Sequence, residues 1–340
     1  MNILLTAAGR RAYLVDFFKE ALKMCGGGYV CVANTTADAT AYLAADDHII
    51  VPPSSSETYI RVLLDYCQAK KIKLLFSLHD WDAPIIAQHK DAFLEIGTIP
   101  VMAKSEILQV CLDKYQTMQM MNQLGICVPK TYLNLNDVLN ALKRKELHYP
   151  LIIKPRWGQG SLGIFKVESE EELKWGYYFS NKQANAFAST CSLINPNEPQ
   201  VIIQECIVGE EYGCDIINDL NGSFRRAFVK HKFGMRSGET DAAETVENTK
   251  ILEDAQKIAR WSAHLGCMDS DFMMGKDGIP YLIELNPRFG GGYPFSHCAG
   301  ANVPLACIRW AMGDEDFENI WASTYQLGVK TFKDIALKTI

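Results

Sequence analysis

The first 110 residues alternate short β-branched runs with helical patterns, and this alternation constrains the fold more than any other feature. The runs that read as strands are NILLT (2–6), YVCVAN (29–34), HIIV (48–51) and KLLFS (73–77). The helical patterns between and after them end near Met24 or cover Glu57–Ala69 and Trp81–Phe93. Because strands connected through helices pair in parallel, we predict an open parallel sheet covered on both faces. Ligands bind such sheets where strands end and helices begin.

Charged residues follow two strands of this predicted sheet. Gly9, Arg10 and Arg11 come after the first strand, and they form either an anion site at a helix N-terminus or a solvated turn. Asp80 and Asp82 follow the fourth strand, where they either recognise an amine or serve as helix N-caps. The residues by themselves leave both alternatives open.

The composition is that of a folded enzyme and excludes several other classes of protein. The chain has 340 residues, 48% of them hydrophobic and 22% charged, which is enough for two or three packed units. No apolar run reaches the roughly 18 residues of a membrane helix, and a net charge of −6 argues against a nucleic-acid surface. Eleven cysteines without a C-x-x-C pair indicate reduced thiols. With no signal peptide in MNILLTAAGRR, we expect a cytoplasmic protein.

The pattern changes after Lys104, and this change predicts further units. Helical stretches run to about Leu124, and a strand-rich region begins at Gln200 with a hairpin turn at Asn221-Gly222. We expect an α/β unit over 1–112, a second unit over 113–199 and an α+β unit over 200–340. The polar stretch 181–199 suggests an exposed insertion. The aromatic residues just before it are expected to pack internally; they are Trp175, Tyr177, Tyr178 and Phe179.

The segment WGQGSLG resembles a dinucleotide fingerprint but stands in the wrong context. Gly158, Gly160 and Gly163 fit G-x-G-x-x-G, yet the strand-like IFKV follows them where a helix would be required. The glycines therefore predict a strand–loop–strand hairpin directly after Lys154. Such a hairpin can cover phosphates while the lysine supplies charge and Ser161 a hydroxyl, although a purely structural hairpin remains the alternative. No G-x-x-x-x-G-K-[ST] motif occurs, which excludes a Walker loop.

Two later strands carry an acidic and amide pattern suited to a divalent cation. Asp271 lies on CMDSDFMM, while Glu284 and Asn286 lie two residues apart on PYLIELNP and so share one face of that strand. Carboxylate and amide oxygens suit Mg²⁺, and Arg288 follows at once to stabilise charge on a phosphoryl group. A solvated acidic face is the alternative.

The strand VIIQECIVGEEYGCD (201–215) offers a third set of polar residues. Gln204 and Glu205 point to opposite faces if the strand is regular. The backbone of 205–207 is able to read an adenine edge, and Glu211 to accept from a ribose hydroxyl. Taken without the other two segments, these residues favour surface charge on an edge strand.

These segments occur in one order and together resemble the ATP-grasp superfamily of carboxylate–amine ligases. The resemblance covers about Lys114 to Gly292, and residues 1–112 resemble the α/β domain that precedes the ATP-grasp core. VMAKSEILQVCLDKYQT and ELNPRFGGG are most similar to the carbamoyl-phosphate-synthase large-subunit branch. The implied architecture is an open parallel α/β domain followed by an α+β ATP-grasp fold in two subdomains. We expect a single-copy, stand-alone member.

The resemblance also implies roles for individual residues. It assigns contacts with ATP to Lys114, Lys154, Gly160, Ser161, Gly163, Gln204, Glu205, Ile207 and Glu211. The lysines would contact phosphates or the adenine N7 side, the flap residues 160–163 would cover the phosphates, residues 204–207 would line the adenine pocket, and Glu211 would hold the ribose. The implied ligands of one or two Mg²⁺ ions, or of Mn²⁺, are Asp271, Glu284 and Asn286. Catalysis would rest on Arg288 and Lys154.

The implied reaction is phosphorylation of a small carboxylate by ATP, followed by attack of an amine or another nucleophile on the acyl phosphate. The alternatives are activation of bicarbonate, as in carbamoyl-phosphate synthase, and a nucleotide-binding regulatory protein without turnover. A nicotinamide-dependent dehydrogenase is disfavoured because Gly9 is the single glycine in the first turn. The expected partners are small-molecule substrates, with no nucleic acid and no membrane, and a homodimer is compatible with the sequence.

Departures from the family pattern leave both substrates open. The H-G-x-x-G-E segment of D-alanyl dipeptide ligases does not occur, and Asp269 stands where those relatives often carry an arginine. Lys230, Lys232 and Arg236 either bind a substrate carboxylate or γ-phosphate, or form a solvated basic edge. His297 is expected to have a structural role.

Overall fold

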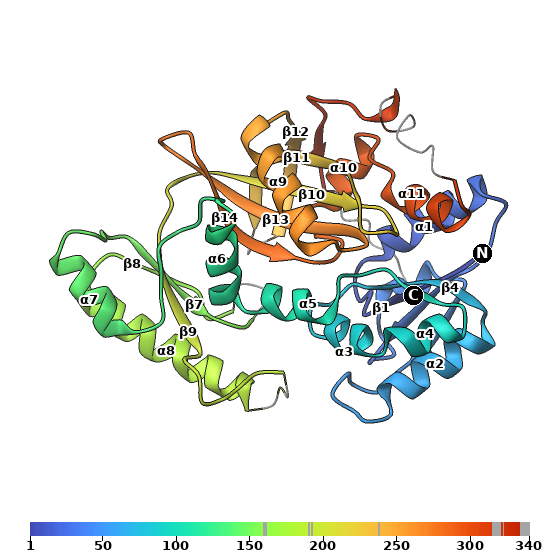
Figure 1. Cartoon of the computed structure of the whole chain (residues 1–340), viewed down its shortest axis with the longest axis horizontal. Coiled ribbons are helices and arrows are strands. Elements are labelled where there is room, and N and C mark those ends of the chain that lie inside the picture. The colour runs from blue at the N-terminus through green and yellow to red at the C-terminus, as the bar shows by residue number, and fades with distance from the viewer. Residues whose placement is uncertain are drawn as a thin grey trace.

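The computed structural model describes residues 1–158, 162–189, 191, 193–236, 239–314, 321 and 323–333. These residues form three β-sheets, each with helices packed against it (Figure 1). The first sheet is parallel and the other two are antiparallel, as the sequence predicted. The sheets come from successive parts of the chain, and segments from all three meet near the centre of the molecule.

The first sheet has five parallel strands in the order β3-β2-β1-β4-β5. Its strands are β1 (Asn2–Thr6), β2 (Val30–Asn34), β3 (Asp47–Ile50), β4 (Ile72–Ser77) and β5 (Ile99–Pro100). Its helices are α1 (Ala12–Met24), η1 (Thr40–Leu43), α2 (Tyr59–Ala69), α3 (Asp82–Gln88) and α4 (Lys90–Glu95). Ile3 and Leu5 face one core and Leu4 the other, because side chains alternate along a strand. The helix expected over Trp81–Phe93 is two helices, since the backbone leaves the helical region at His89.

The second sheet has four antiparallel strands in the order β6-β9-β7-β8. They are β6 (Thr131–Tyr132), β7 (Leu151–Pro155), β8 (Phe165–Val167) and β9 (Val201–Glu205), and the helices α7 (Leu135–Lys143) and α8 (Glu170–Ala188) pack beneath them at the left of Figure 1. β7 and β8 are the two strands expected to flank the glycine loop. Since β9 pairs with β6 and β7, we propose to move the boundary after the second unit from 199/200 to residues 206–208.

The stretch 181–199 is exposed over much of its described part, but it is not a separate insertion. Helix α8 continues to Ala188, and Ala188 and Ile194 are buried against Trp81 and Trp157. The sequence did not predict the end of this helix because only a narrow stripe of mostly small residues along α8 is buried and the rest is polar or exposed. The expectation that the aromatic residues of α8 pack internally holds for Tyr177, which packs against the core. It is wrong for the other three, whose exposed fractions are 58% for Trp175, 57% for Tyr178 and 46% for Phe179.

The third sheet has six strands in the order β14-β13-β10-β11-β12-β15. They are β10 (Gly209–Asn218), β11 (Phe224–Arg236), β12 (Glu239–Thr245), β13 (Gly266–Gly275), β14 (Pro280–Asn286) and β15 (Lys330–Phe332). Helix α9 (Thr249–Ser262) covers one face, while α10 (Tyr293–Cys298) and α11 (Val303–Ala311) pack at one end of the other face and join the core of the first sheet. Helices α5 (Ser105–Leu112) and α6 (Lys114–Gln123) link the first sheet to the other two (Figure 1).

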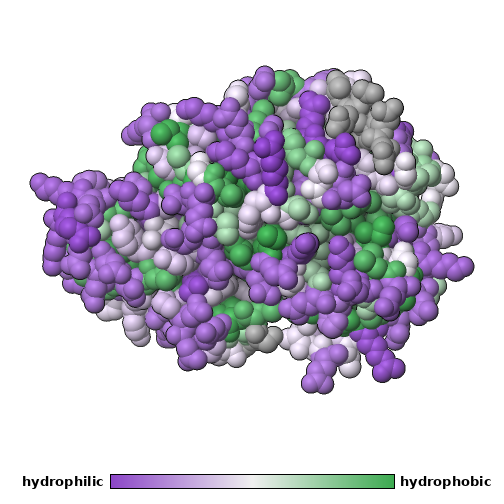
Figure 2. Space-filling view, viewed as in Figure 1, coloured by the Kyte–Doolittle hydropathy of each residue, from purple (hydrophilic) through white to green (hydrophobic). Residues whose placement is uncertain are grey.

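The rest of the third sheet's second face is polar. Ile217 and Phe228 lie under α10 and α11, but the residues further along the same strands are charged. Polar residues also dominate the outer surface in Figure 2. Within the described residues, no helix combines the length and apolar character needed to cross a membrane. All eleven cysteines are described and free, in agreement with the prediction of reduced thiols.

Candidate active site

The register of the third sheet places charged side chains side by side. Gly213 of β10 lies opposite Lys230 of β11 and Asp271 of β13, and Asp271 lies opposite Glu284 of β14. Side chains at paired positions project from the same face of a sheet. The next positions along this face add Asp215, Asp269 and Asn286 in one row and Glu211 and Lys232 in another. The three expected metal ligands therefore share one face.

Gly213 makes room for two lysines on this face. A side-chain Cβ at this position would lie 2.9 Å from Cε of Lys232 and 3.0 Å from Cε of Lys230. Both lysines therefore lie over the glycine. Lys232 donates to Glu211 Oε1 at 2.9 Å and forms a close ion pair with Asp271. Burial opposes the charge of Lys232, but the carboxylates of Asp271, Asp269 and Glu211 raise its pKa, so it remains an ammonium.

Lys230 forms the floor of the site. Its Nζ donates to Asp215 Oδ2 at 2.6 Å, and neither side chain is exposed. Ser296 of α10 donates to the same oxygen at 2.5 Å. The sequence left Lys230 and Lys232 open between ligand binding and a solvated edge; both are buried, which excludes the solvated edge. Only the backbone of Arg236 is described.

Asp269 is a buried carboxylate beside the expected metal ligands. Asn286 lies 3.4 Å from its Oδ2, and a Cβ at Gly290 would lie 2.2 to 2.4 Å from its carboxylate atoms. Burial and the neighbouring Asp271 raise the pKa of Asp269 to about 7, while Lys230 and Lys232 act in the opposite direction. The backbone at Gly290 lies so close to the Asp269 carboxylate that a larger side chain would collide with it.

Two lysines of the second unit face the same carboxylates. Lys114 begins α6 and donates to the carbonyl of Gly158 at 2.6 Å, and its Nζ lies 3.1 Å from Glu284 Oε1. Lys154 of β7 is 5% exposed. Burial lowers the pKa of Lys154 to about 8, with Glu284 raising it and Lys114 lowering it. An anion that approaches these lysines would favour their charged forms.

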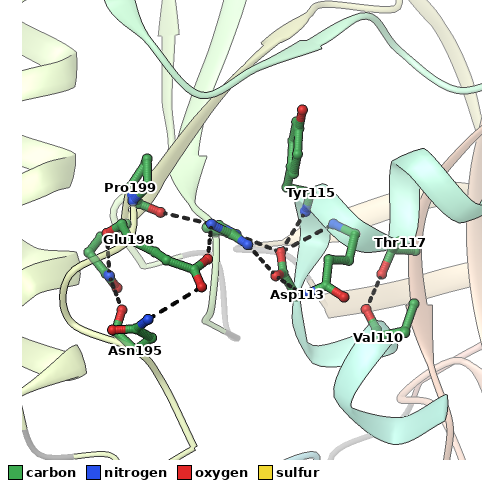
Figure 3. A network of polar contacts seen from close by, with 10 residues as sticks. Val110, Asp113, Tyr115, Thr117, Asn195, Glu198 and Pro199 are labelled. Carbon is green, nitrogen blue, oxygen red and sulfur yellow. Dashed lines mark hydrogen bonds and ion pairs between the residues drawn. The ribbon is translucent and has the colours of Figure 1, made fainter. Parts of the chain in front are cut away.

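A buried ion-pair network fixes the backbone next to both lysines (Figure 3). Asp113 precedes Lys114 and caps α6 by accepting from the Tyr115 N–H at 3.0 Å. The Arg156 guanidinium, two residues after Lys154, donates to Asp113 at 2.7 and 2.6 Å and also pairs with Glu198. A bidentate pair of this kind sets the orientation of both partners. The network thus holds the start of α6 against the end of β7.

The residues expected at the adenine and flap regions are only partly brought together. Gln204 is buried and donates to Thr131 Oγ1 at 2.8 Å, so its side chain links β9 to β6 within the second sheet. Glu205 ends β9, Ile207 lies in the short link to β10, and Glu211 reaches the charged face. Gly163 lies beside Pro155 of β7 and Gln183 of α8. Gly160 and Ser161 lie outside the described residues.

The first unit contributes Asp80, which the sequence offered as an amine-binding residue or a helix N-cap but did not pair with Arg288. Arg288 forms an ion pair with Asp80, which follows β4. Asp80 lines a small cleft together with Lys114, Gly158, Glu284 and Asn286, so all three units border it. Sequence reasoning missed Gly213 and Gly290. The two-residue spacing of Lys230 and Lys232 was the available signal that they share a face. His297 stacks on Phe17 with ring centroids 3.6 Å apart, in line with a structural role.

Two family models match parts of the chain. Residues 111–292 match the ATP-grasp domain model, and residues 3–102 match the PylC-like N-terminal domain model. A carbamoyl phosphate synthase arginine-specific large chain from Geobacillus stearothermophilus is 26% identical over 299 residues. The aligned part is 85% of this chain and 26% of that protein, so the chain spans about a quarter of that relative's length.

Solved structures of the same fold include carboxylases and a ligase. The biotin carboxylase domain dimer of 2-oxoglutarate carboxylase from Hydrogenobacter thermophilus, solved with MgADP, ADP and bicarbonate, has a TM-score of 0.70 and 18% identity, and covers 92% of this chain and 69% of that one. An L-amino acid ligase from Bacillus licheniformis has a TM-score of 0.67 and 17% identity, with coverages of 94% and 77%. Together with the match over more than half of its residues, this shared fold shows that the chain belongs to the ATP-grasp family.

Proposed function

We propose that the protein is an ATP- and Mg²⁺-dependent ligase that converts a small carboxylate to an acyl phosphate and joins it to an amine or another nucleophile. The observation that carries this proposal is the meeting of three units at one cleft. The third unit supplies the oxygens of Asp271, Glu284 and Asn286, the second supplies cations, and the first closes the cleft. A cleft with both charge types suits a nucleotide triphosphate and its metal.

The donor set fits a hard divalent cation that is shared with phosphates. Asp271 and Glu284 are paired across two strands, and Asn286 is on the same face. Among the described residues, no group of three or more His, Cys, Asp and Glu side chains could hold a metal ion without help, so phosphate oxygens would complete the shell. Bound Mg²⁺ would neutralise charge on the transferring phosphoryl group.

The chain's own residues would bind and orient ATP. Lys114 and Lys154 would supply positive charge for the phosphates, and the role of residues 160–163 as a cover over the phosphates stays a prediction. The link between β9 and β10, with Glu205 and Ile207, would read the adenine, and Glu211 would hold the ribose. Arg288 would stabilise charge on the reacting carboxylate and phosphoryl oxygens. The strands β13 and β14 hold Asp271, Glu284 and Asn286 more rigidly than loops can, which favours positioning as the main source of catalysis.

The reaction has two steps. A carboxylate oxygen of the substrate attacks the γ-phosphorus of ATP, the bond to the β-phosphate oxygen breaks, and ADP leaves. The nucleophile then attacks the carbonyl carbon of the acyl phosphate, inorganic phosphate leaves with the electron pair of the broken C–O bond, and an amine nucleophile loses one proton. We assign no general base, since the described geometry singles none out.

The relatives support two kinds of carboxylate. The amino acid ligase favours an amino acid as substrate, whereas the carboxylase bound to bicarbonate favours bicarbonate. We place the amino acid or similar small carboxylate first, with bicarbonate as the second candidate. The biotin carboxylase domain of the Hydrogenobacter thermophilus enzyme is a dimer, which supports the proposal that this protein forms a homodimer.

Phosphate release from Mg·ATP tests the proposal, measured across a grid of carboxylates, including bicarbonate, against amines, including ammonia. Stimulation by one pair is expected and would name both substrates. Glu284→Gln should abolish the metal-dependent turnover, while Glu168→Gln, an exposed glutamate with 66% of its side chain accessible, should leave it unchanged. Binding of Mg·ATP without turnover for any pair would instead identify a regulatory nucleotide-binding protein.

A further inference from the structure

Asp80 and Arg288 form a largely buried pair between the first and third units. Asp80 follows β4 and Arg288 follows β14, 208 residues later. The Nη2 of Arg288 donates to Asp80 Oδ2 at 2.9 Å, and its Nε lies 2.8 Å from Asp80 Oδ1. The exposed fractions of the two side chains are 12% and 10%. The first contact is a hydrogen bond and the second is an ion-pair contact, and together they restrict where the guanidinium can lie.

The remaining contacts of Arg288 determine which edge is available. Its Nη1 donates to the Phe289 carbonyl at 3.2 Å, and its Nη2 lies 3.4 Å from Asn286 Oδ1. Nη1 carries two N–H groups, and the second has no acceptor within the described part of the chain. An incoming anion would therefore meet the Nη1 edge, because Asp80 occupies the opposite edge formed by Nε and Nη2.

Both partners are charged despite their burial. Burial alone would raise the pKa of Asp80, but Arg288 and the nearby cations hold it below its ordinary value. Burial would likewise lower the pKa of Arg288, but Asp80 raises it. A second guanidinium is close by, since Arg11 of the first unit donates to the carbonyl of Leu78 and its pKa is lowered by burial and by Arg288. Without the Asp80 carboxylate, less negative charge would offset the repulsion between the Arg11 and Arg288 guanidinium groups.

We propose that Asp80 is a positioning residue, which holds the Arg288 guanidinium so that its Nη1 edge faces the reacting carboxylate and phosphoryl group. The proposal rests on the proposed function for the role of Arg288. The first unit then takes part in the chemistry through a residue that need not touch the substrate. A free arginine side chain populates several rotamers, and a misplacement of about 1 Å at a reacting centre can cost on the order of 10²-fold in rate.

A double-mutant cycle on kcat tests this proposal with the full chain. Asp80→Ala should lower kcat by about 10- to 100-fold with the KM for ATP changed less than about threefold, and Asp80→Glu should recover part of the rate. In an Arg288→Ala background, Asp80→Ala should cost less than about twofold, because the group it positions is already gone. If the two substitutions multiply, Asp80 acts independently of Arg288 and the proposal is wrong.

Asp219→Asn provides the matched control. Asp219 is also buried and also pairs with an arginine, since Arg225 Nε and Nη2 lie 2.8 and 2.7 Å from its Oδ2, but it lies in the β10–β11 turn. This control should lose stability to urea and keep kcat. If it lowers kcat as much as Asp80→Ala does, general destabilisation explains both and the proposal is overturned.

A structural readout separates this inference from the proposed function. A crystal structure of Asp80→Ala with Mg·ADP should show Arg288 in a different rotamer or with several, whereas the wild-type protein should keep one. An unchanged Arg288 would overturn the positioning role whether or not turnover is found. Absence of turnover in the wild-type protein, with Arg288 displaced in the variant, would count against the proposed function alone.

Discussion

Lys230→Met isolates the energetics of the floor beneath the charged face. Lys230 and Asp215 have no exposed surface, and Lys230 Nζ lies 2.6 Å from Asp215 Oδ2. Methionine has an unbranched side chain of similar length, so the substitution removes the charge and leaves little empty volume. Asp215 would keep its hydrogen bond from Ser296 but would have lost its direct ion-pair partner.

The expected loss of stability is large because only one partner is removed. Breaking a buried pair in this way costs about 3 to 5 kcal/mol, since the remaining charge is neither hydrated nor compensated. That range is about a 10²- to 10⁴-fold change in the unfolding equilibrium and a large part of the 5 to 15 kcal/mol of a typical domain. Replacing both partners, as in Lys230→Met with Asp215→Leu, should cost much less, because no buried charge of the pair is left.

Urea unfolding of the three proteins at pH 7, followed by tryptophan fluorescence, measures these differences. Lys250→Met, at an exposed position where Nζ contacts the Gly278 carbonyl, controls for the residue change and should shift stability by less than about 0.5 kcal/mol. If Lys230→Met costs less than about 1 kcal/mol, or as much as the double variant, the argument from an uncompensated buried carboxylate is refuted.

Two further predictions concern the nucleotide site. Because burial lowers the pKa of Lys154 to about 8, its side chain is protonated well below that pH and neutral well above it. The affinity for Mg·ATP should therefore fall as the pH rises from 7 to 9.5. Calorimetric titration checks this, and Lys154→Arg should flatten the profile; an equal fall in both proteins would assign the pH dependence to another group. Gly290→Ala places a Cβ within 2.4 Å of the Asp269 carboxylate and should destabilise the protein by about 1 to 3 kcal/mol, whereas Gly291→Ala meets no atom within 4 Å. Equal melting temperatures for these two variants would contradict the proposed packing of Asp269.

Local sequence patterns predicted the strands and helices that carry the site better than they predicted which residues belong to the site. The β13–β14 hairpin follows from two strand-like runs around a glycine-containing turn, and the two-residue period then places Glu284 and Asn286 on one face. The same reasoning failed for residues 181–188, where few apolar residues mark the buried stripe of α8. It also failed at the end of the second unit, since nothing in β9 itself reveals that it pairs with β6 and β7.

Contacts over long sequence separations account for most of what the sequence left open. Lys232 meets Asp271 because β10 lies between their strands and carries Gly213 at the crossing point, a matter of register between strands. The sequence could not decide whether Lys230 and Lys232 bind a ligand or form a solvated edge. Their burial excluded the solvated edge, and burial depends on the elements packed around a residue.

The amino-acid sequence by itself determined the parallel first sheet, the glycine hairpin and the oxygen-rich strand pair, and its motifs resemble the ATP-grasp family. The strands and the hairpin depend on periodicity and spacing within segments of a few tens of residues, where local sterics and side-chain alternation act directly. Only the tertiary structure decided that Asp80 meets Arg288 and that Gly213 admits two lysines. Such contacts arise from the packing of whole units, whose relative placement no local pattern encodes.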